Sequence, residues 1–196
     1  MKISSKNYTP EIREQLMQQV QMQMSEKRFR HVLGVEEMAI ALAKKYGCCP
    51  NKASIAALAH DYAKERSDDA FIYMIEKLHM DVDLLNWDNA IWHGIVGAEF
   101  VRQELGIEEE DILQAIRLHT TGAAQMSLLD QVIYVADYIE PNRDFPGVEE
   151  ARKLALTDLA AAVAYETQHT LQFLLKKELP IYPKTLETYN KWIAKK

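Results

Sequence analysis

Apolar residues recur at every third or fourth position along almost the whole chain, and this period constrains the fold more than any other feature. Such spacing places side chains on one face of an α-helix, whereas a half-buried β-strand requires alternation. Alternating stretches bounded by turn residues are hard to find. We therefore predict an all-α protein. With 196 residues, 48% of them hydrophobic and 27% charged, the chain suits one domain over residues 1–196.

Capping and stop residues divide this pattern into helices. Gly47 offers a helix stop, and Ser127 with Asp130 three residues later resembles a capping box. We expect helices after Thr9 and after Thr185 and over residues 25–46, 51–65, 87–105, 109–119, 127–140 and 148–177. Residues 66–86 mix a short helical pattern with loop signals. Residues 140–147 and 178–185, each with two prolines, are expected to be irregular segments that either present ligand groups on a rigid scaffold or simply connect helices.

The charge of the chain narrows the classes of partner. A formal net charge of -6 argues against nucleic acid, which needs a basic face. A small phosphorylated ligand remains compatible if a metal or a few Lys and Arg residues concentrate positive charge locally. The sequence has no apolar run of roughly 18 residues, and its N-terminus lacks the apolar stretch of a secretory signal, so we expect a cytoplasmic protein without membrane contact.

Several titratable side chains fall on apolar helix faces. His31 shares a face with Val35 and Leu42, and a single histidine of this kind is more often a satisfied core residue than a ligand. His60 and Asp61 follow a run of small residues, about 100° apart around a helix, which suits a metal ion wedged between helices.

Asp137 lies in the apolar segment LLDQVIYVADYIE. Burying an unpaired carboxylate there would cost roughly several kcal/mol of free energy, so Asp137 requires either a metal or an Arg or Lys partner. His93 and His119 also lean inward. Two histidines and two aspartates from such a group form an N2O2 ligand set suited to a divalent transition metal such as iron, manganese or zinc. His79 and His169 show no comparable surroundings, and we expect both to be structural or surface residues.

The order of these residues resembles that of a known family. His31, then the pair His60-Asp61, then Asp137 is similar to the HD-domain superfamily of metal-dependent phosphohydrolases. The strings RHVLGVEEMAIALAKKYG, ALAHDYAKE, WHGIVGAEF, AIRLHTTG and LLDQVIYVADYIEPNRDFPG look like those of the bacterial YqeK-type HD proteins, which split diadenosine tetraphosphate into two ADP. The resemblance covers residues 28–185 and implies an HD-domain helical bundle with a metal site between central helices.

The resemblance also implies roles for individual residues. Iron, with manganese or zinc as alternatives, would be held by His31, His60, Asp61 and Asp137. Nucleotide contacts would fall on Arg28, Asp61, Lys64, His93, His119, Thr120, Asp137, Arg143, Ile181, Tyr182, Pro183, Lys184 and Thr185. HD proteins are known in which histidines such as His93 and His119 bind phosphate, and others in which they hold a second metal. The resemblance leaves open a monomer or a homodimer.

Hydrolysis of a phosphoanhydride gives the catalytic residues their expected roles. Asp61 could orient the attacking water or accept its proton, Lys64 could meet a phosphate oxygen, and protonated His93 or His119 could donate a proton to the leaving ADP. Lys64 could instead pair with a nearby acid on the surface, as could Arg143, and Tyr182 could pack in the core instead of against adenine. Another nucleotide substrate, or a nucleotide sensor without turnover, is the alternative function.

Overall fold

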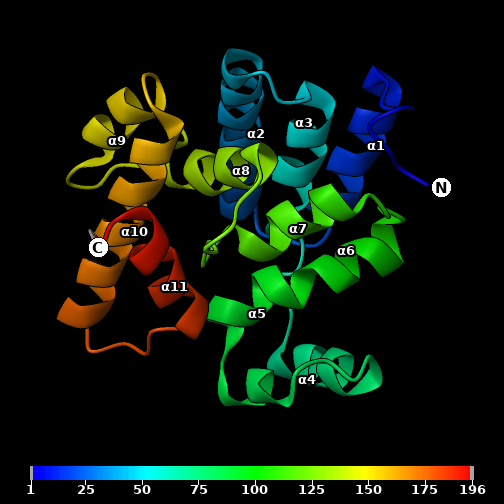
Figure 1. Cartoon of the computed structure of the whole chain (residues 1–196). Helices are drawn as coiled ribbons and strands as arrows, with labels where there is room; N and C mark the ends of the chain where they lie inside the picture. Colours follow the sequence, from blue (N-terminus) through cyan, green and yellow to red (C-terminus); the bar gives the residue numbers. More distant parts are fainter. Residues whose placement is uncertain (1, 195–196) are drawn as a thin grey trace.

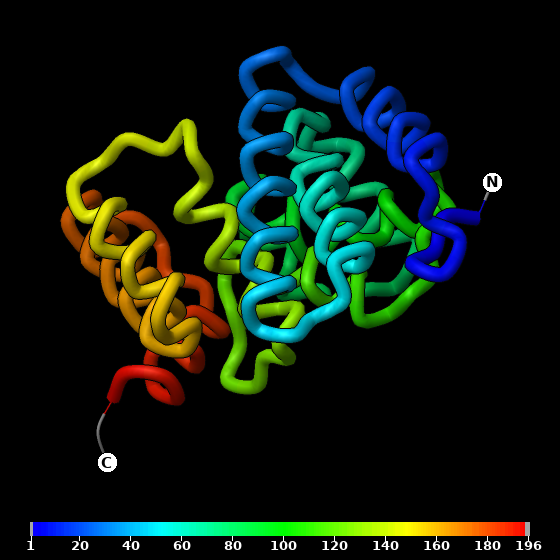
Figure 2. The backbone as a smooth tube through the Cα atoms, turned by 90° about the horizontal axis from the view of Figure 1, so that it is seen from above, coloured from blue at the N-terminus to red at the C-terminus, as the bar shows by residue number. Residues whose placement is uncertain are grey.

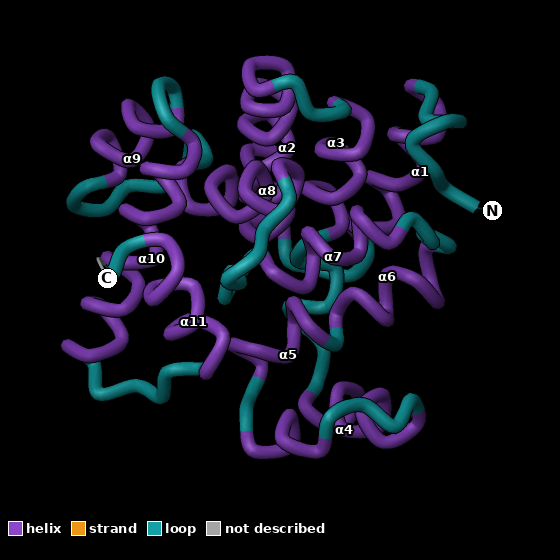
Figure 3. The backbone as a smooth tube through the Cα atoms, viewed as in Figure 1, coloured by secondary structure: helices purple, strands orange, loops and turns teal. Residues whose placement is uncertain are grey.

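The computed structural model describes residues 2–194 and is built from helices joined by short loops (Figure 3). Residues 1, 195 and 196 of the expected domain lie outside this described part. The helices are α1 (Pro10–Gln21), α2 (Glu26–Tyr46), α3 (Pro50–Ala59), α4 (Asp68–Lys77), the 3-10 helix η1 (Val82–Asn86), α5 (Asn89–Ile95), α6 (Gly97–Leu105), α7 (Glu110–Leu118), α8 (Leu128–Ile139), α9 (Val148–Ala155), α10 (Leu159–Lys176) and α11 (Pro183–Trp192). Within residues 2–194 the β-type pairing is an isolated bridge between Ile3 and Ile107, so the all-α prediction is confirmed.

Helices α2, α3, α7 and α8 pack against one another and form the centre of the molecule (Figure 1). Helix α1 contacts α3, and α5 and α6 contact α7. Helices α9, α10 and α11 form a second group, which is joined to the centre through α8 and lies to one side when the molecule is seen from above (Figure 2). One continuous apolar core runs from Ile3 to Val163 through the central helices.

Local signals place the ends of the central helices. The Ser25 side chain accepts a hydrogen bond from the Arg28 backbone N–H at the start of α2, and Gly47 ends that helix with a φ of 80°, which glycine adopts without steric cost. Ser127 and Asp130 form the expected capping box at the start of α8. These predicted boundaries are confirmed.

Four expected boundaries are wrong. The predicted helix 51–65 ends at Ala59, and the predicted helix 87–105 is divided at Val96 into α5 and α6. The predicted helix 148–177 is divided because Asp158 caps a new helix, its side chain accepting from the Ala161 N–H. The last helix begins at Pro183, before the expected Thr185, and residues 66–86 contain α4 and η1.

Among the described residues, no helix has both the length and the apolar character that a membrane span requires.

Candidate metal centre and nucleotide site

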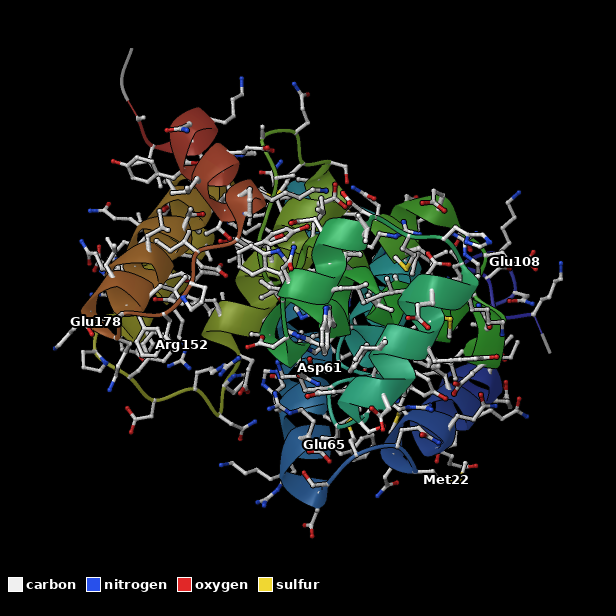
Figure 4. The ribbon with its side chains drawn as sticks, turned by 90° about the horizontal axis from the view of Figure 1, so that it is seen from below. Met22, Asp61, Glu65, Glu108, Arg152 and Glu178 are labelled. Carbon is white, nitrogen blue, oxygen red and sulfur yellow. The ribbon has the colours of Figure 1, made fainter. Side chains whose placement is uncertain are left out.

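The pair His60-Asp61 lies in a tight turn that directly follows α3. Small buried side chains of α3, including Ala56 and Ala57, let the neighbouring helices approach closely. The Tyr62 N–H donates to the Ala59 carbonyl and the Lys64 N–H to the Asp61 carbonyl, so the chain turns with a tighter period than an α-helix. The predicted helix 51–65 therefore ends before Asp61 and Lys64, although both side chains still face the same site. Figure 4 shows Asp61 near the middle of the molecule and Glu65 further out.

The four expected metal ligands come together between α2, the turn after α3, and α8. His31 Nε2 lies 3.0 Å from Asp137 Oδ1 and 3.7 Å from Asp61 Oδ2. His60 Nε2 lies 3.5 Å from Asp61 Oδ2. His60 and Asp137 also share a group with His119 in which the possible ligand atoms are all within 4.8 Å of one another. Residues more than a hundred positions apart in the chain thus surround one point.

In each of the four histidines of the site, the ring nitrogen Nε2 faces the centre of the cluster. The outward nitrogen Nδ1 of three of them faces a backbone carbonyl: His60 to Ala57 at 2.6 Å, His93 to Asn89 at 2.6 Å and His119 to Ile116 at 2.7 Å. Because a carbonyl only accepts, Nδ1 carries the proton in each ring and Nε2 turns a lone pair towards the cluster. This is the tautomer that binds a metal ion through Nε2.

His31 is oriented by a carboxylate instead. Its Nδ1 lies 3.1 Å from Glu140 Oε1, and Glu140 is buried with only 2% of its surface exposed. The other oxygen of Glu140 accepts from the Asn142 backbone N–H at 2.7 Å and from its side-chain amide at 2.9 Å. This carboxylate fits because Gly34 has no side chain: a Cβ there would lie 2.3 Å from Glu140 Oε2. A carboxylate behind a histidine ligand orients the ring and raises its basicity.

The donor set fits a divalent metal ion. Nε2 of His31 and Nε2 of His60 are buried without a hydrogen-bond partner in the described residues, which is unusual for buried nitrogens. With Nδ1 of His31 donating to Glu140, its Nε2 lone pair would face the Asp137 oxygen at 3.0 Å, so a cation is required between the two atoms. Either a proton or a metal ion meets this requirement. Imidazole nitrogens with carboxylate oxygens suit a transition metal better than calcium.

The protonation states agree with this arrangement. Burial lowers the pKa of His60 to about 4, so its ring is neutral near pH 7. Burial opposes a charge on His31 as well, but the Asp137 carboxylate outweighs it and raises the pKa of His31. Burial also opposes the ionisation of Asp61, but the surrounding imidazoles outweigh it and hold the pKa of this carboxyl below its usual range.

Three cations border the cluster. Arg28 Nη1 donates to Asp61 Oδ2 at 2.9 Å, and Arg143 Nη2 donates to Asp137 Oδ1 at 2.8 Å. The Lys64 ammonium lies 3.3 Å from His93 Nε2, and burial lowers its pKa. The alternative surface pairings of the two expected phosphate-binding cations are absent from the described residues: Lys64 forms no ion pair with a neighbouring acid, and Arg143 pairs with Asp137 instead of a surface acid. Asp137 therefore has an arginine partner. This was one of the two alternatives expected for its buried carboxylate, and a metal ion was the other.

A second group of ligand atoms lies on the other side of Asp61. Asp61 Oδ1 is 3.7 Å from His93 Nε2 and 3.8 Å from His119 Nε2, and these three residues form a further possible metal-binding group. The Thr120 hydroxyl lies 3.0 Å from Nε2 of both histidines. Burial, and then His119, lowers the pKa of His93 to about 3, so this ring is neutral near pH 7 and cannot serve as the proton donor that we expected. The two oxygens of Asp61 thus face two separate sets of imidazoles.

An aromatic cavity of about 290 Å³ adjoins this second group. Thr120 lies on its wall, together with Trp87, Tyr182 and Thr185. The Tyr182 ring meets the Trp87 ring edge to face, with centroids 4.8 Å apart. Tyr182 is therefore a cavity residue and is only half-buried. Of the other residues expected to bind nucleotide in this segment, Ile181, Pro183 and Lys184 are not on the cavity wall, and Pro183 and Lys184 are exposed.

Three residues of the site were not predicted from the sequence. Glu140 and Trp87 were treated as helix-end residues, and Gly34 was not considered. A glycine inside a long amphipathic helix costs about 1 kcal/mol relative to alanine, which is a signal that something approaches closely there. His79 is exposed at the end of α4, and His169 stacks on Tyr165 with ring centroids 3.9 Å apart, so neither belongs to the cluster.

Comparisons with known proteins agree with this geometry. Residues 28–142 match the HD domain family, a stretch that begins at Arg28 and includes the four expected metal ligands. The fold and the site define an HD domain, and the chain belongs to the HD-domain family.

Two similar relatives carry the same name. A protein of Halalkalibacterium halodurans is 50% identical over 89% of this chain and 93% of its own length, and one of Bacillus subtilis is 48% identical over 93% of this chain and 97% of its own. Both are called "Bis(5'-nucleosyl)-tetraphosphatase, symmetrical". A crystal structure of a "predicted HD superfamily hydrolase involved in NAD metabolism" from Clostridium acetobutylicum is 36% identical, with a TM-score of 0.87 over 93% of this chain and 97% of that one.

Proposed function

We propose that the chain is a symmetrical bis(5'-nucleosyl)-tetraphosphatase, a metal-dependent hydrolase that converts diadenosine tetraphosphate and water into two ADP. The observation that carries the proposal is the cluster of His31, His60, Asp61 and Asp137, whose unpartnered imidazole nitrogens fit a divalent ion. The two relatives at 48% and 50% identity carry this activity in their names and match nearly the full length of the chain. The substrate is a small nucleotide.

A divalent ion held by His31, His60, Asp61 and Asp137 would supply Lewis acidity, which polarises phosphoryl oxygens and lowers the pKa of water. We propose iron, which the family resemblance implies, with manganese and zinc as the alternatives that the N2O2 donor set also suits. A second ion beside His93 and His119 remains open. The single domain over residues 1–196, the cytoplasmic location and the homodimer also stay predictions.

The protein supplies charge and orientation around the scissile bond. Asp61 is ionised and presents an oxygen to each side, so it can orient the attacking water and accept its proton. Lys64 holds a phosphoryl oxygen beside His93, where its partial burial strengthens the attraction. Arg143 offers a planar fork to a further phosphate.

The departing ADP needs little help from a proton donor. The second pKa of a terminal phosphate is about 6, so the leaving group is stable as an anion at pH 7. Neutral His93 therefore contributes a lone pair, and Thr120, which lies 3.0 Å from its Nε2, can donate a hydrogen bond to the ring or to a phosphate oxygen. The negative charge that develops on the leaving group is balanced by Lys64 and Arg143.

Product analysis in ¹⁸O-water tests the proposal. The protein with iron or manganese is incubated with diadenosine tetraphosphate, and the nucleotides are separated by chromatography. We expect ADP alone, with one ¹⁸O atom for every two ADP molecules. AMP together with ATP would show asymmetrical cleavage, and unchanged substrate after long incubation would show a nucleotide sensor without turnover; either result contradicts the proposal.

A further inference from the structure

A second, basic cavity of about 530 Å³ opens on the other side of the metal cluster. Its basic and polar wall comes from the start of α2 and from the loop after α8: Lys27, Arg28, Arg30, His31, Asn142 and Arg143. We refer to these six residues as the basic cavity. It shares no lining residue with the aromatic cavity that contains Trp87 and Tyr182.

Most charges of the basic cavity are already neutralised by the protein. Arg28 and Arg143 pair with carboxylates of the cluster. Two acids also line the cavity: Glu65 accepts hydrogen bonds from the Ser25 backbone and hydroxyl, both at 2.7 Å, and Glu140 accepts from His31 and Asn142.

Lys27 and Arg30 are the exception. Both are exposed at the wall of the basic cavity, and neither forms an ion pair with any acid between residues 2 and 194. On a chain with a formal net charge of -6, two unpaired cations beside two arginines create a local positive field. Such a field attracts a polyanion that enters the cavity.

Asp61 lies between the two cavities. His31 lies on the wall of the basic cavity and faces Asp61 Oδ2, whereas Thr120 lies on the wall of the aromatic cavity and contacts the two histidines that face Asp61 Oδ1. A ligand that occupies both cavities must therefore cross the metal cluster near its middle. Diadenosine tetraphosphate is such a ligand, because its two ADP halves are joined by the bond that symmetrical hydrolysis breaks.

We propose that the basic cavity is the binding site of the second ADP unit of the substrate, with Lys27 and Arg30 contacting its phosphates and ribose. This inference rests on the proposed function. The aromatic cavity then holds the first adenosine against Tyr182, and the bond between the second and third phosphates lies over Asp61. When that P–O bond breaks, the oxygen of water joins one ADP, the bridging oxygen leaves with the other, and both protons of the water are released as the two terminal phosphates ionise.

A double variant, Lys27→Ala with Arg30→Ala, tests the assignment. The KM for diadenosine tetraphosphate should rise by about tenfold, which corresponds to about 1.4 kcal/mol, with a weaker dependence of KM on salt. The matched control, Lys44→Ala with Lys45→Ala, removes two exposed cations from the last turn of the same helix and should leave KM unchanged. An unchanged KM in the first variant, or an equal rise in the control, would overturn the inference.

Calorimetric titration with ADP provides a readout independent of turnover. The manganese-loaded wild type should bind two ADP per chain, and the Lys27→Ala, Arg30→Ala variant one. A single ADP in the wild type, or two in the variant, would refute the second site. If the wild type cleaves no diadenosine tetraphosphate, the proposed function fails, and the ADP stoichiometry still decides whether the basic cavity binds a nucleotide.

Discussion

Replacing Gly34 by alanine separates helix propensity from the geometry of the metal site. On propensity alone, alanine within α2 should stabilise the protein by about 1 kcal/mol. The structure predicts the reverse, because the added Cβ would lie 2.3 Å from Glu140 Oε2, whereas an ordinary contact begins near 3.4 Å. The carboxylate must therefore retreat by about 1 Å and release His31, at a cost of about 1.5–3 kcal/mol for a hydrogen bond to a charged group.

The net expectation is a loss of about 0.5–2 kcal/mol in the free energy of unfolding, together with a decrease in metal affinity of about 10- to 100-fold, the range for a lost partner behind a metal ligand. Chemical denaturation of the metal-free protein and calorimetric titration with manganese measure the two quantities. The control is Gly97→Ala in α6, whose Cβ would meet the Ala63 Cβ at 3.4 Å, an ordinary contact; it should lower neither the free energy of unfolding nor the metal affinity.

A double-mutant cycle with Glu140→Ala identifies the cause. If the collision with Glu140 explains the effect, Gly34→Ala should weaken metal binding no further once Glu140 has been truncated. A Gly34→Ala protein that is more stable by about 1 kcal/mol and binds metal as tightly as the wild type would refute the reasoning.

Further predictions concern the ligands, the cavity and a buried acid. Asp61→Ala should lose metal and activity together in elemental analysis, whereas Lys64→Ala should keep the metal and lose rate; metal retained in the Asp61 variant would contradict the ligand assignment. Tyr182→Ala should raise KM by about tenfold through lost stacking on a base without changing the metal content. Glu166 is buried, and this raises the pKa of its carboxyl well above the ordinary value. The folded state thus holds a proton that the unfolded state releases, so the contribution of Glu166 to stability is greatest at low pH and falls as pH rises above about 4.5. Glu166→Gln should remove this part of the pH dependence in denaturation curves from pH 4 to 9, and an unchanged slope would contradict it.

The helical class and many helix ends follow from neighbouring residues. A helix needs only its own period and caps, and Ser25, Gly47 and the pair Ser127 and Asp130 act within one turn of the chain. The break after Ala59 did not follow, because residues 51–65 keep a helical pattern. That turn is stabilised by what surrounds it: the His60 and Asp61 side chains are buried against other helices, so tertiary contacts override the local preference.

The clustering of buried histidines and aspartates was also predictable, because burying them on apolar faces costs free energy unless they share a partner. The choice of ligands among them came from the family resemblance and stays a prediction. The mutual distances of these residues were not predictable, since nothing local relates His31 to Asp137 across more than a hundred residues. The role of Glu140 was not predictable either. Its contact with His31 requires the space left by Gly34 in α2, and the Glu140 carboxylate enters that space from the end of α8.

The sequence by itself determined that this chain forms helices and which side chains have to be neutralised together inside them, because both depend on residue type and on spacing along the backbone. Only the tertiary structure decided that Asp61 faces two sets of imidazoles, that Arg28 and Arg143 border the metal cluster, and that one cavity is aromatic and the other basic. Those features are distances between side chains on different helices, and they exist only after the core has packed.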